Sequence, residues 1–275
     1  MKKPFLLFVL LALPVTFSLS SYALRVANTL VLLGKLPSLV EESSGLELAD
    51  QPNTYWTHND AGNEAVLYKI NEKGKLLSQL QVNGTENKDW EDLAQDTKGF
   101  LYIGDMGDNG NRRKDLRIYK MSMKNGNRVQ VLNFTYADKP KGKIEKEARN
   151  FDCEAFFWHA NHLYLISKDR GQSKTAKLYS LPDTPGTHVA KLLAKKDFPG
   201  QVTSADLSPD GRNLAVLTFG KVYLYPVAAG STQFFSKAPK VLELPRSGQV
   251  EAVVFKNNKT LIISNEEGSL YRYSL

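Results

Sequence analysis

The chain has 275 residues, with 36 Lys and Arg against 29 Asp and Glu, a formal net charge of +7 and one cysteine. This length suits a single β-domain with an ample core. A moderate positive charge, without a Lys/Arg-rich helix or an aromatic-basic RNA motif, excludes a typical nucleic-acid-binding protein. A single cysteine excludes an internal disulfide, so the hydrophobic core has to stabilise the fold.

Residues 1–23 are typical of a secretory signal peptide. Lys2 and Lys3 precede an apolar run over 4–19, and Ser21-Tyr22-Ala23 supplies the small residues of a cleavage site. The alternative, an N-terminal membrane anchor, is disfavoured because the run is short and contains Pro14. We therefore expect a secreted or periplasmic protein, a single domain over 24–275, and no stable membrane insertion after cleavage.

The rest of the chain predicts short β-strands, because runs of Val, Ile, Leu, Tyr and Phe alternate with Gly, Asn, Asp and Pro. In chain order the runs cover 29–36, 53–58, 65–70, 76–82, 100–104, 116–121, 129–134, 162–167, 176–181, 188–193, 213–218, 221–226, 239–244, 260–264 and 269–275. The Lys-rich connection 138–150 is expected to contain a helical turn over 143–148. An apolar-Tyr pair recurs at Tyr68, Tyr119, Tyr179, Tyr223 and Tyr271, which predicts packing between repeats.

A motif with a polar first residue recurs five times and sets the repeat. Its copies are Ser44-Gly45-Leu46-Glu47-Leu48, Glu91-Asp92-Leu93-Ala94, Glu154-Ala155-Phe156-Phe157, Ser204-Ala205-Asp206-Leu207 and Glu251-Ala252-Val253-Val254. Spacings of 47, 63, 50 and 47 residues suit one four-stranded blade per repeat. We predict an all-β, five-bladed β-propeller in which 29–36 completes the last blade and closes the ring.

The first residues of the motif predict a metal site. Five oxygen-bearing side chains at the same point of five blades would converge on the axis; they are Ser44, Glu91, Glu154, Ser204 and Glu251. Three carboxylates need a counter-charge or a proton, and flanking acids such as Asp89 and Asp152 add to the crowding. Calcium, which accepts several oxygen ligands, is the predicted cofactor. The alternative is a water-filled tunnel lined by solvated side chains.

Polar turns after each second strand are expected to surround the mouth of the tunnel. They cover 56–62, 104–113, 168–171, 219–220 and 265–268. Each is also a plain turn sequence, since Asn, Asp and Gly tolerate positive φ. Within these turns Asp60 and Asp105 are candidate general bases, and Arg113 and Arg170 are candidates for offsetting the charge of an anion. His58 fits either an acid-base role or a structural hydrogen bond.

The order Ser, Glu, Glu, Ser, Glu on five inner strands resembles the calcium-dependent nucleotidases of the apyrase family. The resemblance covers most of 24–275 and is most specific over 89–94 and 101–107. It implies a five-bladed propeller with one central calcium, held by Ser44, Glu91, Glu154, Ser204 and Glu251. Two loops differ from the family pattern: Asp108-Asn109-Gly110 replaces Lys-Glu-Trp, and the Arg-rich third loop is reduced to Lys168-Asp169-Arg170. The sequence is also similar to uncharacterised secreted bacterial propellers.

Two functions remain open. The first is a secreted, calcium-dependent hydrolase of phosphate esters or anhydrides, acting on a small anionic substrate. The second is a non-catalytic, calcium-stabilised propeller that binds an envelope glycan or a protein partner. A lactonase-type propeller is a weaker third possibility, because those proteins usually have six blades and Asn metal ligands. In each case we expect a monomer that does not bind nucleic acid, with Cys153 as a buried apolar residue.

Overall fold

The computed structural model describes residues 29–123 and 128–275, so the predicted signal peptide lies outside the described residues. The described part is all-β, as predicted, apart from one short 3₁₀ helix, η1 (Lys146–Ala148), in the expected helical turn. The strands are β1 (Leu30–Lys35), β2 (Ser43–Leu48), β3 (Thr54–Asn59), β4 (Val66–Asn71), β5 (Leu76–Gln81), β6 (Trp90–Gln95), β7 (Phe100–Asp105), β8 (Arg117–Ser122), β9 (Val129–Tyr136), β10 (Asp152–His159), β11 (His162–Lys168), β12 (Thr175–Pro182), β13 (Gly186–Asp197), β14 (Val202–Leu207), β15 (Asn213–Thr218), β16 (Lys221–Pro226), β17 (Lys240–Glu243), β18 (Val250–Asn257), β19 (Thr260–Asn265) and β20 (Ser269–Ser274).

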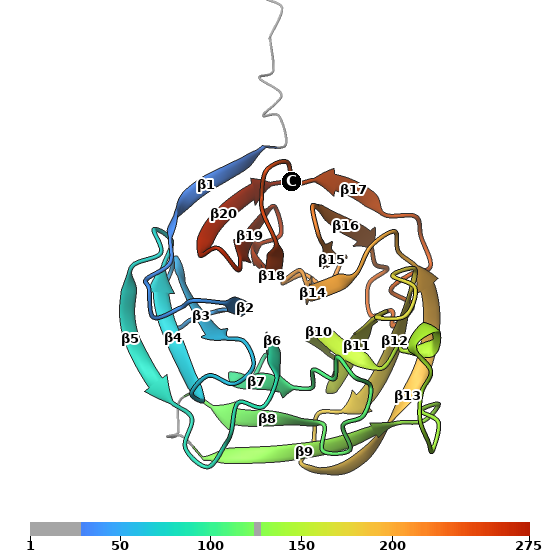
Figure 1. Ribbon diagram of the computed structural model, residues 1–275. Helices are drawn as coiled ribbons and strands as arrows, with labels where there is room; N and C mark the ends of the chain where they lie inside the picture. Colours follow the sequence, from blue (N-terminus) through green and yellow to red (C-terminus); the bar gives the residue numbers. More distant parts are fainter. Residues whose placement is uncertain (1–28, 124–127) are drawn as a thin grey trace, which may run out of the picture.

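The strands form antiparallel groups of four that follow the chain: β2–β5, β6–β9, β10–β13, β14–β17 and β18–β20 with β1. Figure 1 shows the groups arranged around a common centre, with β2, β6, β10, β14 and β18 innermost. Each innermost strand contacts the innermost strands of the two neighbouring groups. The groups therefore form a ring in which every first strand faces the centre.

The five groups do not form five separate sheets. Two groups merge into a single eight-stranded sheet, because β9 and β13 pair in parallel over 132–136 and 186–190. Both strands are longer than the other outer strands, with eight and twelve residues. Their extra length brings two outer edges within hydrogen-bonding range, so neither edge remains unpaired along this stretch.

Five hydrophobic clusters hold the ring together, one between each pair of neighbouring groups. The recurring tyrosines are distributed one to a cluster; they are Tyr68, Tyr119, Tyr179, Tyr223 and Tyr271. This confirms the prediction that the aromatic repeat packs one repeat against the next. Because large aromatic side chains bury much apolar area, they contribute strongly to each contact.

The N-terminal strand joins the last group, as predicted. β1 pairs with β20 in antiparallel register, with Leu30 opposite Tyr273 and Lys35 opposite Ser269. The strand also runs close to the β4–β5 turn, where a Cβ on Gly34 would overlap the backbone of Lys73. Residues from the start and the end of the chain thus share one sheet, which covers the edge that β20 would otherwise expose.

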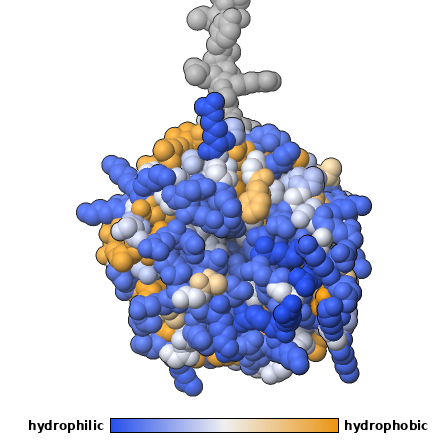
Figure 2. Space-filling model, in the orientation of Figure 1, coloured by the Kyte–Doolittle hydropathy of each residue, from blue (hydrophilic) through white to orange (hydrophobic). Residues whose placement is uncertain are grey.

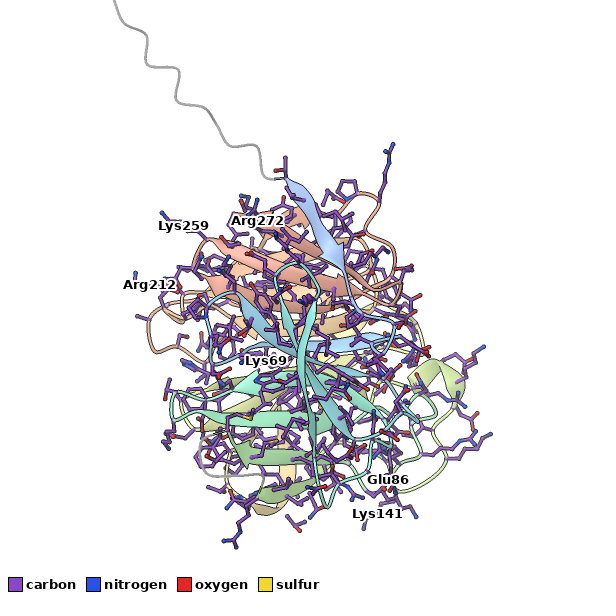
Figure 3. All side chains as sticks on the ribbon, turned by 90° about the vertical axis from the view of Figure 1, so that its left-hand side faces the viewer. Lys69, Glu86, Lys141, Arg212, Lys259 and Arg272 are labelled. Carbon is purple, nitrogen blue, oxygen red and sulfur yellow. The ribbon has the colours of Figure 1, made fainter. Side chains whose placement is uncertain are left out.

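The connections separate onto two sides of the ring. Figure 3 places Arg212 and Lys259, in turns that leave an innermost strand, on the side opposite Glu86 and Lys141, which precede an innermost strand. The face seen in Figure 2 is mostly hydrophilic around its centre. Among residues 29–123 and 128–275, no helix is long and apolar enough to cross a membrane.

Candidate functional site

The five polar residues of the motif lie at equivalent points of the innermost strands. All are at most 7% exposed; they are Ser44, Glu91, Glu154, Ser204 and Glu251. Each strand also has a register shift here, within a residue of the motif's first position: between 43 and 45, 90 and 93, 153 and 155, 202 and 204, and 250 and 252. A β-bulge re-aims the side chains beside it, so the five polar residues do not follow the regular alternation of their strands.

Glu91 is the centre of an acidic cluster. Its carboxylate lies in two groups of three potential ligands, with Asp60 and Asp89 in one and with Asp152 and Glu154 in the other. Within each group the oxygen atoms are within 4.8 Å of one another. Asp60 follows β3, Asp89 precedes β6, and Asp152 and Glu154 belong to β10. We call these five residues the acidic cluster.

Burial and mutual repulsion disfavour ionisation in the acidic cluster. Burial, followed by the charges of Glu154 and Asp152, raises the pKa of Glu91 well above its usual range. Burial, together with Asp60 and Asp152, raises the pKa of Asp89 to about 7. The pKa of Glu154 is also raised, first by burial and then by Asp152. A bound cation or protons must therefore balance this charge.

Basic side chains balance only one half of the acidic cluster. Arg170 donates from Nε to Asp152 and from a terminal nitrogen to Glu154, and Lys168 pairs with the other oxygen of Glu154. Lys168 is buried, which lowers its pKa, but Glu154 and Glu251 outweigh burial and the net pKa is raised. Lys168 thus remains a charged ammonium group near Glu154 and Glu251, two of the acids predicted to bind a metal.

The other half has no such partner. Among the described residues, no hydrogen bond or ion pair reaches the side-chain oxygens of Glu91 or Asp89, although Glu91 is only 5% exposed. Asp60 accepts one hydrogen bond, from the Ala61 backbone N–H at 2.6 Å. Gly107 lies against this half, since a Cβ there would overlap the carboxylates of Glu91 and Asp89.

The two serines and the last glutamate of the predicted metal ring have other partners. Ser44 Oγ donates to the Glu91 carbonyl at 2.9 Å, and Ser204 Oγ donates to Asp92 at 3.1 Å. Glu251 Oε1 accepts from Gln249 Nε2 at 3.0 Å. The structure therefore brings the five residues to the centre of the ring, but both serine hydroxyls are engaged within the protein.

Asp92 is a central residue whose contacts sequence reasoning did not anticipate. It is 1% exposed and accepts hydrogen bonds from the backbone N–H groups of Leu93, Phe156 and Ala205 as well as from Ser204. These contacts connect β6 to β10 and β14, so one carboxylate ties three innermost strands together. The sequence signal was present, because the other four repeats have Gly or Ala at this position.

The four predicted catalytic residues separate into two pairs. Asp60 belongs to the acidic cluster and Arg170 contacts it. In contrast, Asp105 is fully buried and accepts from Arg113 at 2.8 Å and from Tyr119 at 3.3 Å. Arg113 also donates to the Gly107 carbonyl at 2.8 Å. This pair holds the β7–β8 loop in place and is not available to a ligand in this arrangement.

Three further residues near the centre differ in their exposure. His58 is buried, which lowers its pKa to about 4, and its Nδ1 faces the Asn59 carbonyl at 2.9 Å. It is therefore neutral at pH 7 and has the structural contact that the sequence allowed. Cys153 is fully buried, and burial raises its pKa. Phe219, by contrast, is 43% exposed, with Lys168 Nζ 5.4 Å from its ring centroid.

Comparison with known proteins supports the fold and leaves the activity open. No protein-family model and no curated protein matches the chain. Among solved structures, a luciferin-regenerating enzyme matches with a TM-score of 0.51 and 14% identity over 90% of this chain and 95% of that one. An aldose sugar dehydrogenase from Streptomyces coelicolor, bound to PQQ, gives 0.52 and 11% over 90% and 98%. A putative gluconolactonase gives 0.51 and 10% over 84% and 73%. These are β-propeller-type structures, so the chain has a propeller-like all-β fold.

Proposed function

We propose that this protein is a secreted or periplasmic five-bladed β-propeller that binds calcium at the acidic cluster and hydrolyses phosphate esters or anhydrides there. The ring of five four-stranded groups, with one hydrophobic cluster between each pair, supports the blade count. The predicted signal sequence over 1–23 supports export. A monomer suffices for this proposal, because the described residues of one chain supply the whole cluster.

The observation that carries the proposal is the buried, unpartnered carboxylate of Glu91 among four other acids. The donor set fits calcium, because every candidate ligand is an oxygen and hard cations prefer oxygen. Glu91 would hold the ion, together with residues of the predicted ring or with Asp60 and Asp89. A calcium ion bound there would supply positive charge for the oxygens of a phosphate group.

The chain's own residues suit an anionic substrate. The Arg170 side chain is 26% exposed although it contacts two acids, so it can also face a phosphate oxygen. Asp60 is half-buried, and its carboxylate can accept a proton from water. In hydrolysis, water would add to phosphorus and lose a proton to the Asp60 oxygen that does not contact the ion. The bond from phosphorus to the leaving oxygen would break, and the leaving oxygen would take up a proton from water. The exposed ring of Phe219 would contact an apolar part of the substrate.

The test is phosphate release from nucleoside di- and triphosphates and simple phosphate esters, measured with calcium and with a chelator. We expect calcium-dependent release that Asp60→Asn reduces by about 10²-fold or more. Glu64→Gln, which removes an exposed carboxylate on the β3–β4 connection outside the acidic cluster, is the matched control. Absence of release from every substrate by folded protein would exclude the hydrolase.

The alternative function is a non-catalytic propeller that binds an envelope glycan or a protein. One observation favours it: two of the four predicted catalytic residues, Asp105 and Arg113, are bound to each other. In that case calcium would stabilise the ring without chemistry. Calcium-dependent thermal stabilisation without phosphate release would distinguish this function from the hydrolase.

A further inference from the structure

We infer that the cation site lies off the axis of the ring and is formed by Asp60, Asp89 and Glu91 instead of the five motif residues. The inference rests on the proposed function for the presence of a calcium site and specifies which carboxylates form it. The distribution of basic side chains, the isolation of Glu91 and the close approach of Gly107 point to these three residues.

Positive side chains already occupy one side of Glu91. Lys168 and Arg170 both bind Glu154, and Arg170 also binds Asp152, so two cationic groups already occupy that side of Glu91. Lys168 is 4% exposed and cannot turn into solvent without leaving its buried position. A divalent ion placed there would face two like charges at short range, which is costly inside a protein. On the other side, among the described residues, no basic side chain makes an ion pair or a hydrogen bond with Asp60 or Asp89. Lys168 and Arg170 act on Asp60, and Arg113 on Asp89, only through their charges at longer range.

Among the described residues, the Glu91 carboxylate has no hydrogen bond or ion pair. A buried carboxylate without a hydrogen bond or a counter-ion loses its hydration and gains nothing in return. Glu91 comes close to this position: it is 5% exposed, and no hydrogen bond or ion pair to its oxygens is found among the described residues. One of its oxygens lies within 4.8 Å of oxygens from Asp60 and Asp89. The Asp89 side chain likewise has no hydrogen-bond partner among the described residues. Three converging carboxylates with free lone pairs match what a hard cation binds.

Gly107 lets the carboxylates of the proposed site lie close to its backbone. Gly107 lies directly beside Glu91 and Asp89, and its backbone N–H is bound to the Asp89 carbonyl at 3.2 Å. Any side chain at this position would displace the two carboxylates. Asp60 and Asp89 are only half-buried, so the site opens to solvent. Calcium accepts about 6–8 oxygen ligands, and three carboxylates therefore leave positions for water or substrate oxygens.

The experiment is a calorimetric titration of the folded protein with calcium alone, on single-site variants. Asp60→Asn and Asp89→Asn each remove one carboxylate of the proposed site. Both positions are half-buried, so these substitutions should disturb folding least. Glu251→Gln tests the axial alternative. Glu64→Gln removes an exposed carboxylate on the β3–β4 connection, outside both sets, and so controls for the general loss of negative charge. Gly107→Ala tests the space without changing any charge.

We expect Asp60→Asn, Asp89→Asn and Gly107→Ala each to weaken calcium binding by about tenfold or more, and Glu251→Gln and Glu64→Gln to change it by less than about threefold. If Glu251→Gln abolishes binding and the aspartate variants retain it, the ion is axial: the inference is wrong and the proposed function survives. Equal weakening in the four variants that lose a carboxylate would also overturn the inference, because only general electrostatics would be involved. Absence of binding by the wild-type protein would overturn both.

Discussion

Replacing Lys168 by Met should destabilise the protein substantially, because Lys168 neutralises a buried acid. Lys168 and Glu154 have 5% exposed side chains and contact each other. Breaking a buried ion pair by removing one partner costs about 3–5 kcal/mol. Arg170 stays bound to Glu154 and retains part of the compensation, so we expect a loss of about 1.5–3 kcal/mol for Lys168→Met. The methionine keeps most of the apolar stem, which limits the packing loss.

The assay is urea unfolding followed by circular dichroism, with a chelator present so that no metal contributes. The double variant Lys168→Met/Glu154→Gln should recover most of the loss, since both charges are removed together. Lys221→Met is the control: its pair with Glu243 is 40% and 67% exposed and should contribute about 0–1 kcal/mol. The reasoning is refuted if Lys168→Met lies within about 0.5 kcal/mol of the wild type, or if the double variant is no more stable than the single one.

Three further predictions concern the ring, the cysteine and acid stability. Deleting residues 1–36 removes β1 and exposes the edge of β20. The melting temperature should therefore fall, and aggregates should appear in gel filtration. An unchanged melting temperature would contradict the role of β1 in closing the ring. Cys153 is fully buried, and burial raises its pKa. A thiol reagent should therefore react with it only after unfolding. Reaction with the native protein would show that the contacts around β10 open. The hydrogen bond from Lys88, followed by Arg113, lowers the pKa of Asp115 to about 2, so this carboxylate stabilises the fold above pH 4 and loses that effect as the pH falls towards 2. Asp115→Asn should therefore be less stable than the wild type at pH 6 by a small amount, since the group is partly exposed, and the two should converge near pH 2; a constant difference would argue against the ion pair.

Much of the fold was accessible from the sequence because its signals are periodic. The five tyrosines and the five polar motif residues recur at nearly constant spacing, and each tyrosine packs in a different cluster. The pairing of 29–36 with the last group could be predicted because the last repeat lacked its fourth strand. The parallel pairing of β9 with β13 has no such signal, because it depends on how far two outer strands extend.

The site could be predicted less well from the sequence, because many of its side-chain contacts join different repeats. The sequence flagged Asp89 and Asp152 as flanking acids but could not show that Asp60 joins Asp89 across two groups of strands. It could not show that Arg113 turns back onto Asp105 within a flexible-looking loop. Nor could it show Lys168 bound to Glu154, a contact that places a positive charge beside the predicted metal ring.

The central claim is that the acidic cluster around Glu91 binds a calcium ion. The most direct measurement is a crystal structure of the protein with calcium, with the ion identified by anomalous scattering. The account predicts an anomalous peak about 2.3–2.6 Å from a Glu91 oxygen, with water or ligand oxygens completing the coordination. A well-ordered acidic cluster without a peak at millimolar calcium would contradict the account.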